Sequence, residues 1–421
     1  MFWRPKPQVL VSGAGPVGLF AALSLARRGI RVRIIDEEWR GTTHSYALAL
    51  HPRSLELLDE FDLARAVLSK ARDVHAVSFY DGAGRQAQMS LGGLTTKFPL
   101  VAVLAQSDFE DLLVQALEAR DVEVEWNHRL ARFHQASDHV DATVETLGSE
   151  SVGYVIAGSE TVVESSRDIQ VPFLIGADGH DSLVRTQMGI EFLPVRPSDD
   201  FAVFEFDAEG ELPDEMCVVI DNHYTNVLWP MSGNRCRWSF QVDDRAPESS
   251  RDKDRLLMPL GARAHAEVEA GRLSELIAER APWFDAEIGK VHWSKGVRFE
   301  YRLASTFGGQ RVHLVGDAVH MTGPVGVQSM NLGLAESAEL TTILAGILIG
   351  TQSVDALAMH SARRMGEWRR LLGVGAPGLS ATDKALPWTR QHADQLTACI
   401  PASGEHYTKL AAQVGLDPRP M

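Results

Sequence analysis

Three acidic residues follow short apolar runs at widely separated places in the sequence. Each of these runs is typical of a buried strand. Asp36 stands at the end of its run, and Asp178 and Asp317 follow theirs after a short turn that contains glycine. A carboxylate at such a strand end can accept hydrogen bonds from sugar or sugar-alcohol hydroxyls. For Asp317 this is a better match than a phosphate, which the carboxylate would repel. The chemistry that these spacings favour is therefore recognition of a nucleotide.

The first of these acids closes a glycine-rich element near the N-terminus. Residues 9–36 read as a strand, Gly-x-Gly-x-x-Gly, a helix and a second strand. Gly13 permits the tight turn, Gly15 lets backbone approach a pyrophosphate, and Gly18 lets helix and strand lie close together. Asp36 can accept both hydroxyls of an adenosine ribose. The pattern favours a dinucleotide over a plain strand-turn-helix unit but does not separate NAD from FAD. The residues predicted to bind the dinucleotide here are Gly13, Gly15, Pro16, Val17, Gly18 and Asp36.

A second element of the same layout occupies residues 311–337. An apolar strand stops at Gly316-Asp317, a loop containing Gly323, Pro324 and Gly326 follows, and a helical pattern runs from about Met330 to Ile349. Strand, glycine loop and helix direct a helix N-terminus at an anionic or electron-rich group. We therefore expect this segment to bind the same cofactor as the first.

Two further strand ends are candidates for the cofactor site. Residues 176–179, Gly-Ala-Asp-Gly, join an apolar strand to a helix that is expected to start near Ser182, so Asp178 is predicted to line the cofactor; the alternative is an ordinary turn. Gln106 stands at a strand-to-helix junction and could donate to a ligand, although a surface glutamine is an equal alternative. Ser107 or Asp108 is expected to cap that helix.

Composition limits the class of protein. The chain has 421 residues, 45% of them hydrophobic, a net charge of −15 and a pI near 5.5, which disfavours a nucleic-acid partner. Its three cysteines show no metal-ligand spacing, so no metal is expected and the thiols are predicted to be reduced. No apolar stretch is long enough to span a bilayer and the start lacks a secretory pattern. A soluble, cytoplasmic protein is expected.

The order of elements predicts two interleaved parts. The fold class is α/β: a Rossmann-like, glutathione-reductase-type nucleotide domain with an inserted α+β substrate domain of mixed or antiparallel sheet and a C-terminal helical segment. The expected boundaries are 1–180 and 286–375 for the nucleotide domain, 181–285 for the substrate domain with a contribution from 72–97, and 376–421 for the C-terminal helices.

These motifs, in this order, resemble the single-component FAD-dependent aromatic hydroxylases, the flavoprotein monooxygenases of the p-hydroxybenzoate hydroxylase fold. The resemblance lies in GAGPVGL at 13–19, GADGHDSLVR at 176–185 and GDAVHMTGPVGVQSMN at 316–331, and it extends over roughly 8–350. It implies that FAD is reduced by NADPH or NADH and reacts with O2 to a C4a-hydroperoxyflavin, which transfers one oxygen atom to an aromatic or phenolic substrate. A transient visit by NAD(P)H is expected, because only one Gly-x-Gly-x-x-Gly is present.

The resemblance also implies roles for single residues. Gln106 would meet the ribityl or pyrophosphate region, Asp317 a hydroxyl on the flavin side, and Asp178 a region shared by FAD and NAD(P)H. Pro324 would lie beside the isoalloxazine ring, where oxygen reacts. Backbone in the stretch that includes Gly326, Met330 and Asn331 would bind the pyrimidine edge of the flavin.

Two positions depart from the family pattern. Tyr46 stands where the family usually has an arginine near the pyrophosphate and the hydride donor, so it is a candidate for contact with the nicotinamide or substrate. Ser329 stands where the family usually has a glycine in the flavin-facing loop. The consequence of this second change is open.

The inserted segment contains candidate catalytic residues. A phenolic substrate reacts best when deprotonated, so His223 or Tyr224 could act as a base or relay, with Pro324 a further candidate beside the ring. A solvent-exposed turn is the simpler interpretation of the first two. Trp229 and Met231 suit a strand that lines a substrate pocket, and core packing explains them equally well.

Other functions remain as alternatives. A flavin-dependent halogenase would share the nucleotide domain, but Trp229 and Trp238 stand alone and the W-x-W-x-I-P stretch is absent. A non-oxygenating FAD oxidoreductase and a non-catalytic flavin sensor are also open. The expected partners are a small aromatic substrate and O2, with no membrane and no nucleic acid, and the chain is expected to be a monomer or a homodimer.

Overall fold

A parallel sheet of six strands forms the first half of the molecule. The computed structural model describes residues 6–39, 49–82, 84–152, 158–221, 223–242, 270–375 and 379–418. The strand order is β18-β19-β12-β1-β2-β8, with β18 antiparallel to its neighbour. All residues of β1 and β12 are buried, as expected for parallel strands covered on both faces. The strands are β1 (Val9–Ser12), β2 (Val32–Ile35), β8 (Val124–Glu125), β12 (Phe173–Gly176), β18 (Gly308–Gly309) and β19 (Val312–Leu314).

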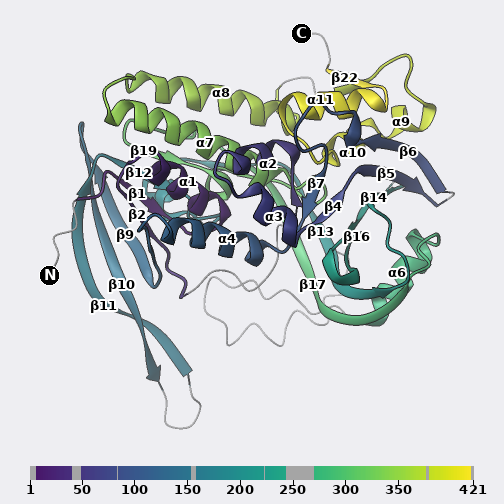
Figure 1. Cartoon of the computed structure of the whole chain (residues 1–421), viewed down its shortest axis with the longest axis horizontal. Coiled ribbons are helices and arrows are strands. Elements are labelled where there is room, and N and C mark those ends of the chain that lie inside the picture. The colour runs from purple at the N-terminus through teal and green to yellow at the C-terminus, as the bar shows by residue number, and fades with distance from the viewer. Residues whose placement is uncertain are drawn as a thin grey trace.

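Helices cover this sheet. Helix α1 packs against α4 and against α7, the long buried helix that starts beside the glycine loop (Figure 1). Their bounds are α1 (Pro16–Arg27), α2 (Pro52–Asp59), α3 (Ala64–Lys70), α4 (Gln106–Glu118), α5 (Leu183–Gln187), α6 (Ala270–Arg280), α7 (Gln328–Leu348) and α8 (Asp355–Leu371).

A second sheet of eight strands lies beside the first. Its order is β20-β17-β13-β16-β15-β14-β5-β6, and it is antiparallel except for the β14–β5 pair. The strands are β5 (Ala76–Asp81), β6 (Gly84–Ser90), β13 (Phe192–Glu209), β14 (Glu215–Ile220), β15 (Thr225–Pro230), β16 (Arg235–Val242), β17 (Glu287–Ala304) and β20 (His320–Met321). Because β5 and β6 pair with β14, residues from the first hundred complete a sheet built mostly from the middle of the chain.

Two smaller three-stranded sheets are also present. Strands β9 (His128–Gln135), β10 (Val140–Val152) and β11 (Gly158–Val171) form a meander whose last two strands project from the body (Figure 1). Strands β3 (Ala49–Leu50), β7 (Val101–Val103) and β4 (Arg72–Val74) make the other.

The C-terminal segment packs on the second sheet. It consists of β21 (Leu379–Ala381), α9 (Pro387–Gln391), α10 (Ala393–Ala398), α11 (Gly404–Gln413) and β22 (Leu416–Pro418). Leu396 and Leu410 share one apolar core with Trp229 of β15 and with Val325 and Val327 of the loop before α7. This core joins three segments that are far apart in the sequence.

The helix starts differ in detail from the sequence predictions. Helix α7 begins at Gln328 rather than Met330, and Ala105, not Ser107 or Asp108, is the N-cap of α4. Strand β17, which begins at Glu287, belongs to the second sheet although residues 286–375 were expected in the nucleotide domain. The C-terminal segment contains a short strand pair besides the expected helices.

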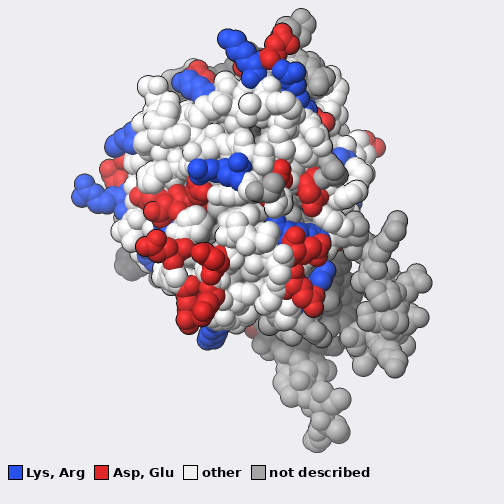
Figure 2. All heavy atoms as spheres, turned by 90° about the vertical axis from the view of Figure 1, so that its right-hand side faces the viewer, with Lys and Arg blue, Asp and Glu red and all other residues white. Residues whose placement is uncertain are grey.

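The surface carries mixed charge. Figure 2, which looks onto the end of the molecule at the right of Figure 1, shows separate groups of acidic and basic side chains rather than a continuous basic face. Within the described ranges, no helix has the length and apolar character that crossing a bilayer requires.

Candidate functional site

The three glycine-containing strand ends meet at one edge of the parallel sheet. Strands β19, β12 and β1 are neighbours, so their carboxyl ends lie together. A Cβ at Gly13 would lie 2.2 Å from the carbonyl oxygen of Ala177, and one at Gly316 would lie 3.2 Å from the Val17 side chain. The segments around Gly13, Ala177 and Gly316 are therefore in direct contact, although the sequence separates them by more than a hundred residues at each step.

The first glycine loop leaves the start of α1 open. Gly13 has a φ of +105°, which favours glycine, and a Cβ at Gly18 would lie 2.0 Å from the Gly13 carbonyl oxygen. Gly15 is the N-cap of α1. Among the described residues, no side chain caps the helix, and a Cβ at Gly15 would meet nothing within 4 Å. Uncapped N–H groups beside open space fit a pyrophosphate.

Asp36 holds this loop from the end of β2. Its Oδ2 accepts a hydrogen bond of 2.5 Å from the Ala14 N–H, and its Oδ1 accepts one of 2.9 Å from the Glu38 N–H. Each carboxylate oxygen can accept more than one hydrogen bond, so acceptor capacity remains for ribose hydroxyls.

Asp178 is engaged mainly with the protein. It accepts a hydrogen bond of 2.6 Å from the Ser182 hydroxyl and one of 3.0 Å from the Val184 N–H, at the start of α5. Burial raises its pKa. The helix starts at the expected place, with Ser182 as the N-cap, and the Asp178 carboxylate stabilises that start. Its predicted contact with the cofactor stays a prediction.

The loop before α7 is strained and firmly held. Val327, a β-branched residue, has a φ of +48° and a ψ of 43°, an arrangement that costs about 1–3 kcal/mol. The next residue, Gln328, donates to the carbonyl oxygens of Ile400 at 2.6 Å and Ala402 at 3.0 Å. A Cβ at Gly326 would lie 2.6 Å from the carbonyl oxygen of Ala398. The C-terminal segment thus fixes the loop that contains Pro324 and Gly326.

Asn331 uses its side chain to join helices. Its Oδ1 accepts from the His51 N–H at 2.8 Å and the Ser54 hydroxyl at 2.7 Å, and its Nδ2 donates to the carbonyl oxygens of Ala49 at 2.9 Å and Val327 at 2.8 Å. The amide is saturated, so only the backbone of this stretch is available to a flavin. Met330 beside it is buried.

The remaining predicted residues lie in different places. Gln106 is the first residue of α4 and donates to Glu110 Oε1 at 2.8 Å. Trp229 and Met231 are buried in the core that contains Val325 and Val327, next to the loop. Tyr46 lies outside the described residues.

His223 and Tyr224 form part of the turn between β14 and β15. Both backbone N–H groups donate to Asp221 Oδ1 at 2.7 Å, and the side chain of His223 is exposed. The Arg280 guanidinium lies 4.1 Å from the centroid of the Tyr224 ring. The solvent-exposed turn that the sequence allowed describes His223 well.

Tyr301 is a residue that the sequence reasoning missed. It lies on β17, its hydroxyl donates to Asp199 Oδ2 at 2.7 Å, and a Cβ at Gly323 would lie 2.2 Å from that hydroxyl oxygen. Burial raises its pKa. The second sheet therefore places a polar group against the loop that contains Pro324. No motif marks Tyr301, since it belongs to an ordinary alternating strand.

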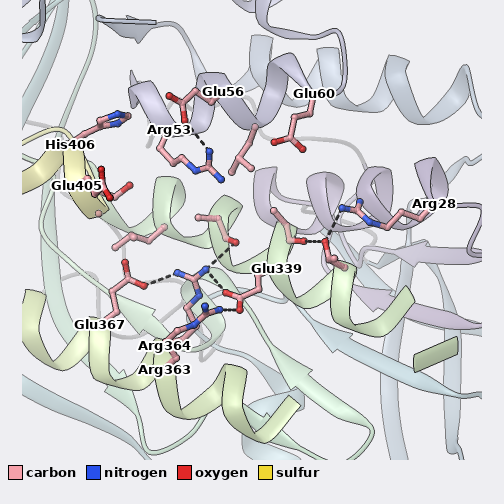
Figure 3. Close-up of a pocket in the computed structure, with 17 residues that line it drawn as sticks. Arg28, Arg53, Glu56, Glu60, Glu339, Arg363, Arg364, Glu367, Glu405 and His406 are labelled. Atoms are coloured by element: carbon pink, nitrogen blue, oxygen red, sulfur yellow. Dashed lines mark hydrogen bonds and ion pairs between the residues drawn. The ribbon is translucent and has the colours of Figure 1, made fainter. Parts of the chain in front are cut away.

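A cavity of about 670 Å³ lies between α2, α7, α8 and α11. Its walls carry acidic and basic side chains that pair with one another: Arg53 with Glu56, and Arg363 and Arg364 with Glu339 (Figure 3). None of the residues predicted to bind the cofactor lines it. Because its charges are mutually neutralised, the cavity indicates no particular ligand.

Two relatives are similar in sequence to this chain over most of its length. A 6-methylpretetramide 4-monooxygenase of Streptomyces rimosus is 28% identical over 369 residues, which is 87% of this chain and 60% of the relative. A para-nitrophenol 4-monooxygenase of a Pseudomonas species is 26% identical over 85% of this chain and 82% of the relative. The chain thus spans less than two thirds of the length of the first of these relatives.

Solved structures have the same fold. The p-nitrophenol 4-monooxygenase of Pseudomonas putida aligns with a TM-score of 0.71 at 20% identity over 97% of this chain and 94% of its own. An anhydrotetracycline hydroxylase of Streptomyces rimosus aligns with a TM-score of 0.64 at 21% identity, over 98% of this chain and 76% of its own. The expected fold class is confirmed.

A family model described as an FAD binding domain matches residues 6–372. That span contains all three glycine motifs and both large sheets. The cofactor that the motifs left open between NAD and FAD is thereby decided, and the chain belongs to the family of FAD binding domain proteins.

Proposed function

We propose that this protein is an FAD-dependent monooxygenase that consumes NAD(P)H and O2 and hydroxylates an aromatic or phenolic substrate. The observation that carries the proposal is the contact of three distant strand ends, at Gly13, Ala177 and Gly316, beside a loop that the second sheet and the C-terminal helices cover. One edge of the fold thus places a nucleotide cradle next to a loop that Tyr301 of the second sheet and the C-terminal segment both contact.

The residues at this edge fit FAD. The uncapped start of α1 at Gly15 would bind the pyrophosphate, and Asp36 the adenosine ribose. Asp317, exposed at the end of β19, would accept a hydrogen bond from a hydroxyl on the flavin side, and backbone near Gly326 would meet the pyrimidine edge. Gln106 and Asp178 would support the middle of the cofactor.

Bound FAD would supply the redox chemistry, passing two electrons from NAD(P)H to O2 so that one oxygen atom enters the substrate and the other leaves as water. The chain's own task is to orient the aromatic ring and exclude water from the reacting edge. Trp229, Met231 and Val325 give that region an apolar core, and Tyr301 offers one polar group beside Gly323.

The names of the relatives support the substrate class. They include enzymes named for nitrophenol, tetracycline-type and rifampicin substrates, all of which contain aromatic rings. This chain covers only part of the length of several of these relatives. We therefore propose for it only the aromatic character that their substrates share, and no single substrate.

The test uses the purified chain with FAD, ¹⁸O2 and a panel of phenols and polycyclic aromatics, with NADH and NADPH supplied in turn. We expect substrate-stimulated oxidation of one or both nucleotides and one ¹⁸O atom in the product. Added bromide is the control for halogenation and is expected to leave the product unchanged.

Three outcomes contradict the proposal. Nucleotide oxidation that yields only hydrogen peroxide with every aromatic compound would indicate an oxidase, and a brominated product would indicate a halogenase. A chain that binds FAD without any turnover would favour a sensor.

A further inference from the structure

Five side chains form a continuous line of hydrogen bonds from the core to the expected cofactor edge. They come from α8, α7, the β20 strand and the turn after β19. In order along the line they are Trp368, Glu336, His320, Ser329 and Asp317.

The inner end of this line is a buried ion pair. Trp368, Glu336 and His320 are fully buried, and the His320 ring stacks on the Trp368 indole with centroids 3.8 Å apart. Trp368 Nε1 donates to Glu336 Oε1 at 2.5 Å, and His320 Nε2 lies 2.9 Å from Glu336 Oε2. Burial favours a protonated Glu336, but His320, Trp368 and the nearby Arg364 outweigh it and lower the pKa of this carboxyl. Glu336 is therefore ionised.

The outer end has a defined donor direction. Ser329 Oγ lies 2.7 Å from Asp317 Oδ1, and since a carboxylate only accepts, Ser329 donates to Asp317. The same hydroxyl oxygen lies 3.1 Å from His320 Nδ1 and 3.3 Å from the His320 carbonyl oxygen, so Ser329 is held against both the ring and the backbone of His320. His320 Nε2 donates to Glu336, because a carboxylate only accepts.

We propose that Ser329 is a positioning residue that connects the buried His320–Glu336 pair to Asp317 and so orients the Asp317 carboxylate toward the flavin. The inference rests on the proposed function, in which Asp317 meets FAD. A glycine, usual here by the family resemblance, has no hydroxyl and would leave His320 Nδ1 without this partner. The serine thus gives Asp317 a hydrogen-bond donor that a glycine lacks.

Hydrogen-bond strength makes the effect measurable. The bond from Ser329 to the Asp317 carboxylate involves a charged partner, and such bonds are stronger and more directional than neutral ones. Asp317 is exposed, so without Ser329 its carboxylate would sample several rotamers and lose orientation before FAD binds.

The first test is FAD affinity, measured by fluorescence titration of apoprotein. Ser329→Ala is expected to weaken FAD binding about tenfold, and Ser329→Thr, which keeps a hydroxyl, is expected to restore most of it. Ser337→Ala is the matched control, because Ser337 lies on the same helix and its hydroxyl has no hydrogen-bond partner among the residues that the structure describes. It should not change FAD affinity.

Coupling is tested by a double-mutant cycle. If Ser329 acts through Asp317, the double variant Ser329→Ala/Asp317→Ala should bind FAD no more weakly than Asp317→Ala alone. A nitrogen NMR spectrum of the histidine side chains gives a readout independent of the cofactor: Ser329→Ala should shift the His320 Nδ1 resonance, because that nitrogen loses its hydrogen-bond partner, and should leave the Nε2 resonance, which reports the bond to Glu336, nearly unchanged.

The outcomes separate this inference from the proposed function. A wild-type chain that binds no FAD removes both. Wild-type binding of FAD, with Ser329→Ala equally tight, additive effects in the cycle and an unchanged His320 spectrum, overturns the role of Ser329 and leaves the proposed function standing.

Discussion

The two large sheets contribute to the site in different ways. At the edge of the parallel sheet, the contacts are made mainly by backbone. Glycines at Gly13 and Gly316 let the strand ends touch, and the start of α1 has no side-chain cap among the described residues. In the eight-stranded sheet, side chains dominate. There Glu205 and Arg237 form a buried ion pair at 2.6 Å, and Trp229 lies in the apolar core.

This difference determines how strictly each region restricts its own sequence. A backbone cradle requires glycine at fixed positions, because a Cβ would strike a neighbouring segment. A core of side chains tolerates many sequences of similar volume and pattern. Cofactor binding should therefore be sensitive to single atoms in the first sheet, whereas changes in the second should act mainly on stability.

The largest expected effect comes from the buried pair of the second sheet. Glu205→Gln leaves the Arg237 guanidinium buried without a countercharge, and we expect the free energy of unfolding to fall by about 3–5 kcal/mol. Asp200→Asn is the control in the same strand; its pair with Arg298 is more exposed and should contribute about 1 kcal/mol or less. Urea denaturation measures both. FAD affinity of folded Glu205→Gln should be unchanged, and a parallel loss of affinity would contradict the division between the sheets.

The next effect belongs to the glycine cradle. Gly13→Ala combines a positive φ, which costs about 1–2 kcal/mol, with a clash against the Ala177 carbonyl, so we expect a stability loss above about 2 kcal/mol and no FAD retained on gel filtration. Gly29→Ala is the matched control, because Gly29 has a φ of +74° in open space. Gly29→Ala should lose only the stability that the positive φ costs, about 1–2 kcal/mol, and it should purify with FAD. Equal FAD content in both variants would argue against the cradle.

Low pH should destabilise the part of the molecule built around the parallel sheet. Burial lowers the pKa of His313 in β19 to about 4, from an ordinary value of 6.5. A lowered histidine pKa stabilises the fold fully above pH 6.5, and this contribution disappears as the pH falls toward 4. At pH 5 the loss should be about 2 kcal/mol. His51, with a pKa lowered by burial to about 3, and His360, lowered to about 4, should add to it.

Denaturation curves at pH 7.5 and pH 5 check this sign. His313→Gln should reduce the difference in unfolding free energy between the two pH values by about 2 kcal/mol. His134→Gln, an exposed change on β9, should leave the difference as it is in the wild type. A wild-type protein that is equally stable at both pH values would show that these histidines do not stay neutral in the fold.

The smallest effect is expected at the exposed acid. Asp317→Ala should weaken FAD binding about tenfold through the loss of one charged hydrogen-bond acceptor, with little change in stability because the side chain is exposed. Asp181→Ala, which removes another exposed acid near the same edge, is the control. If Asp317→Ala purifies fully yellow and binds FAD as tightly as the wild type, the assignment of Asp317 is wrong.

The predictions from sequence succeeded where one residue type has a strict local reason. Gly13, Gly15 and Gly18 marked a strand, turn and helix, and Ser182 marked the start of α5, because those geometries need particular backbones or caps. The cap of α4 was wrong, since Ala105 precedes two equally plausible polar residues. Tyr301 was missed because a tyrosine in an alternating strand carries no local signal of what lies opposite it.

The sequence by itself was enough to predict that strand ends with glycines and acids recognise a dinucleotide, and the family resemblance added FAD. Only the tertiary structure decided what else each residue contacts. The Asn331 side chain forms hydrogen bonds at the start of α2, Asp178 accepts hydrogen bonds at the start of α5, and Ser329 contacts both His320 and Asp317. The physical reason is the distance along the chain over which each property is determined. Backbone conformation is set by neighbours along the chain, whereas hydrogen-bond partners and burial depend on segments hundreds of residues away.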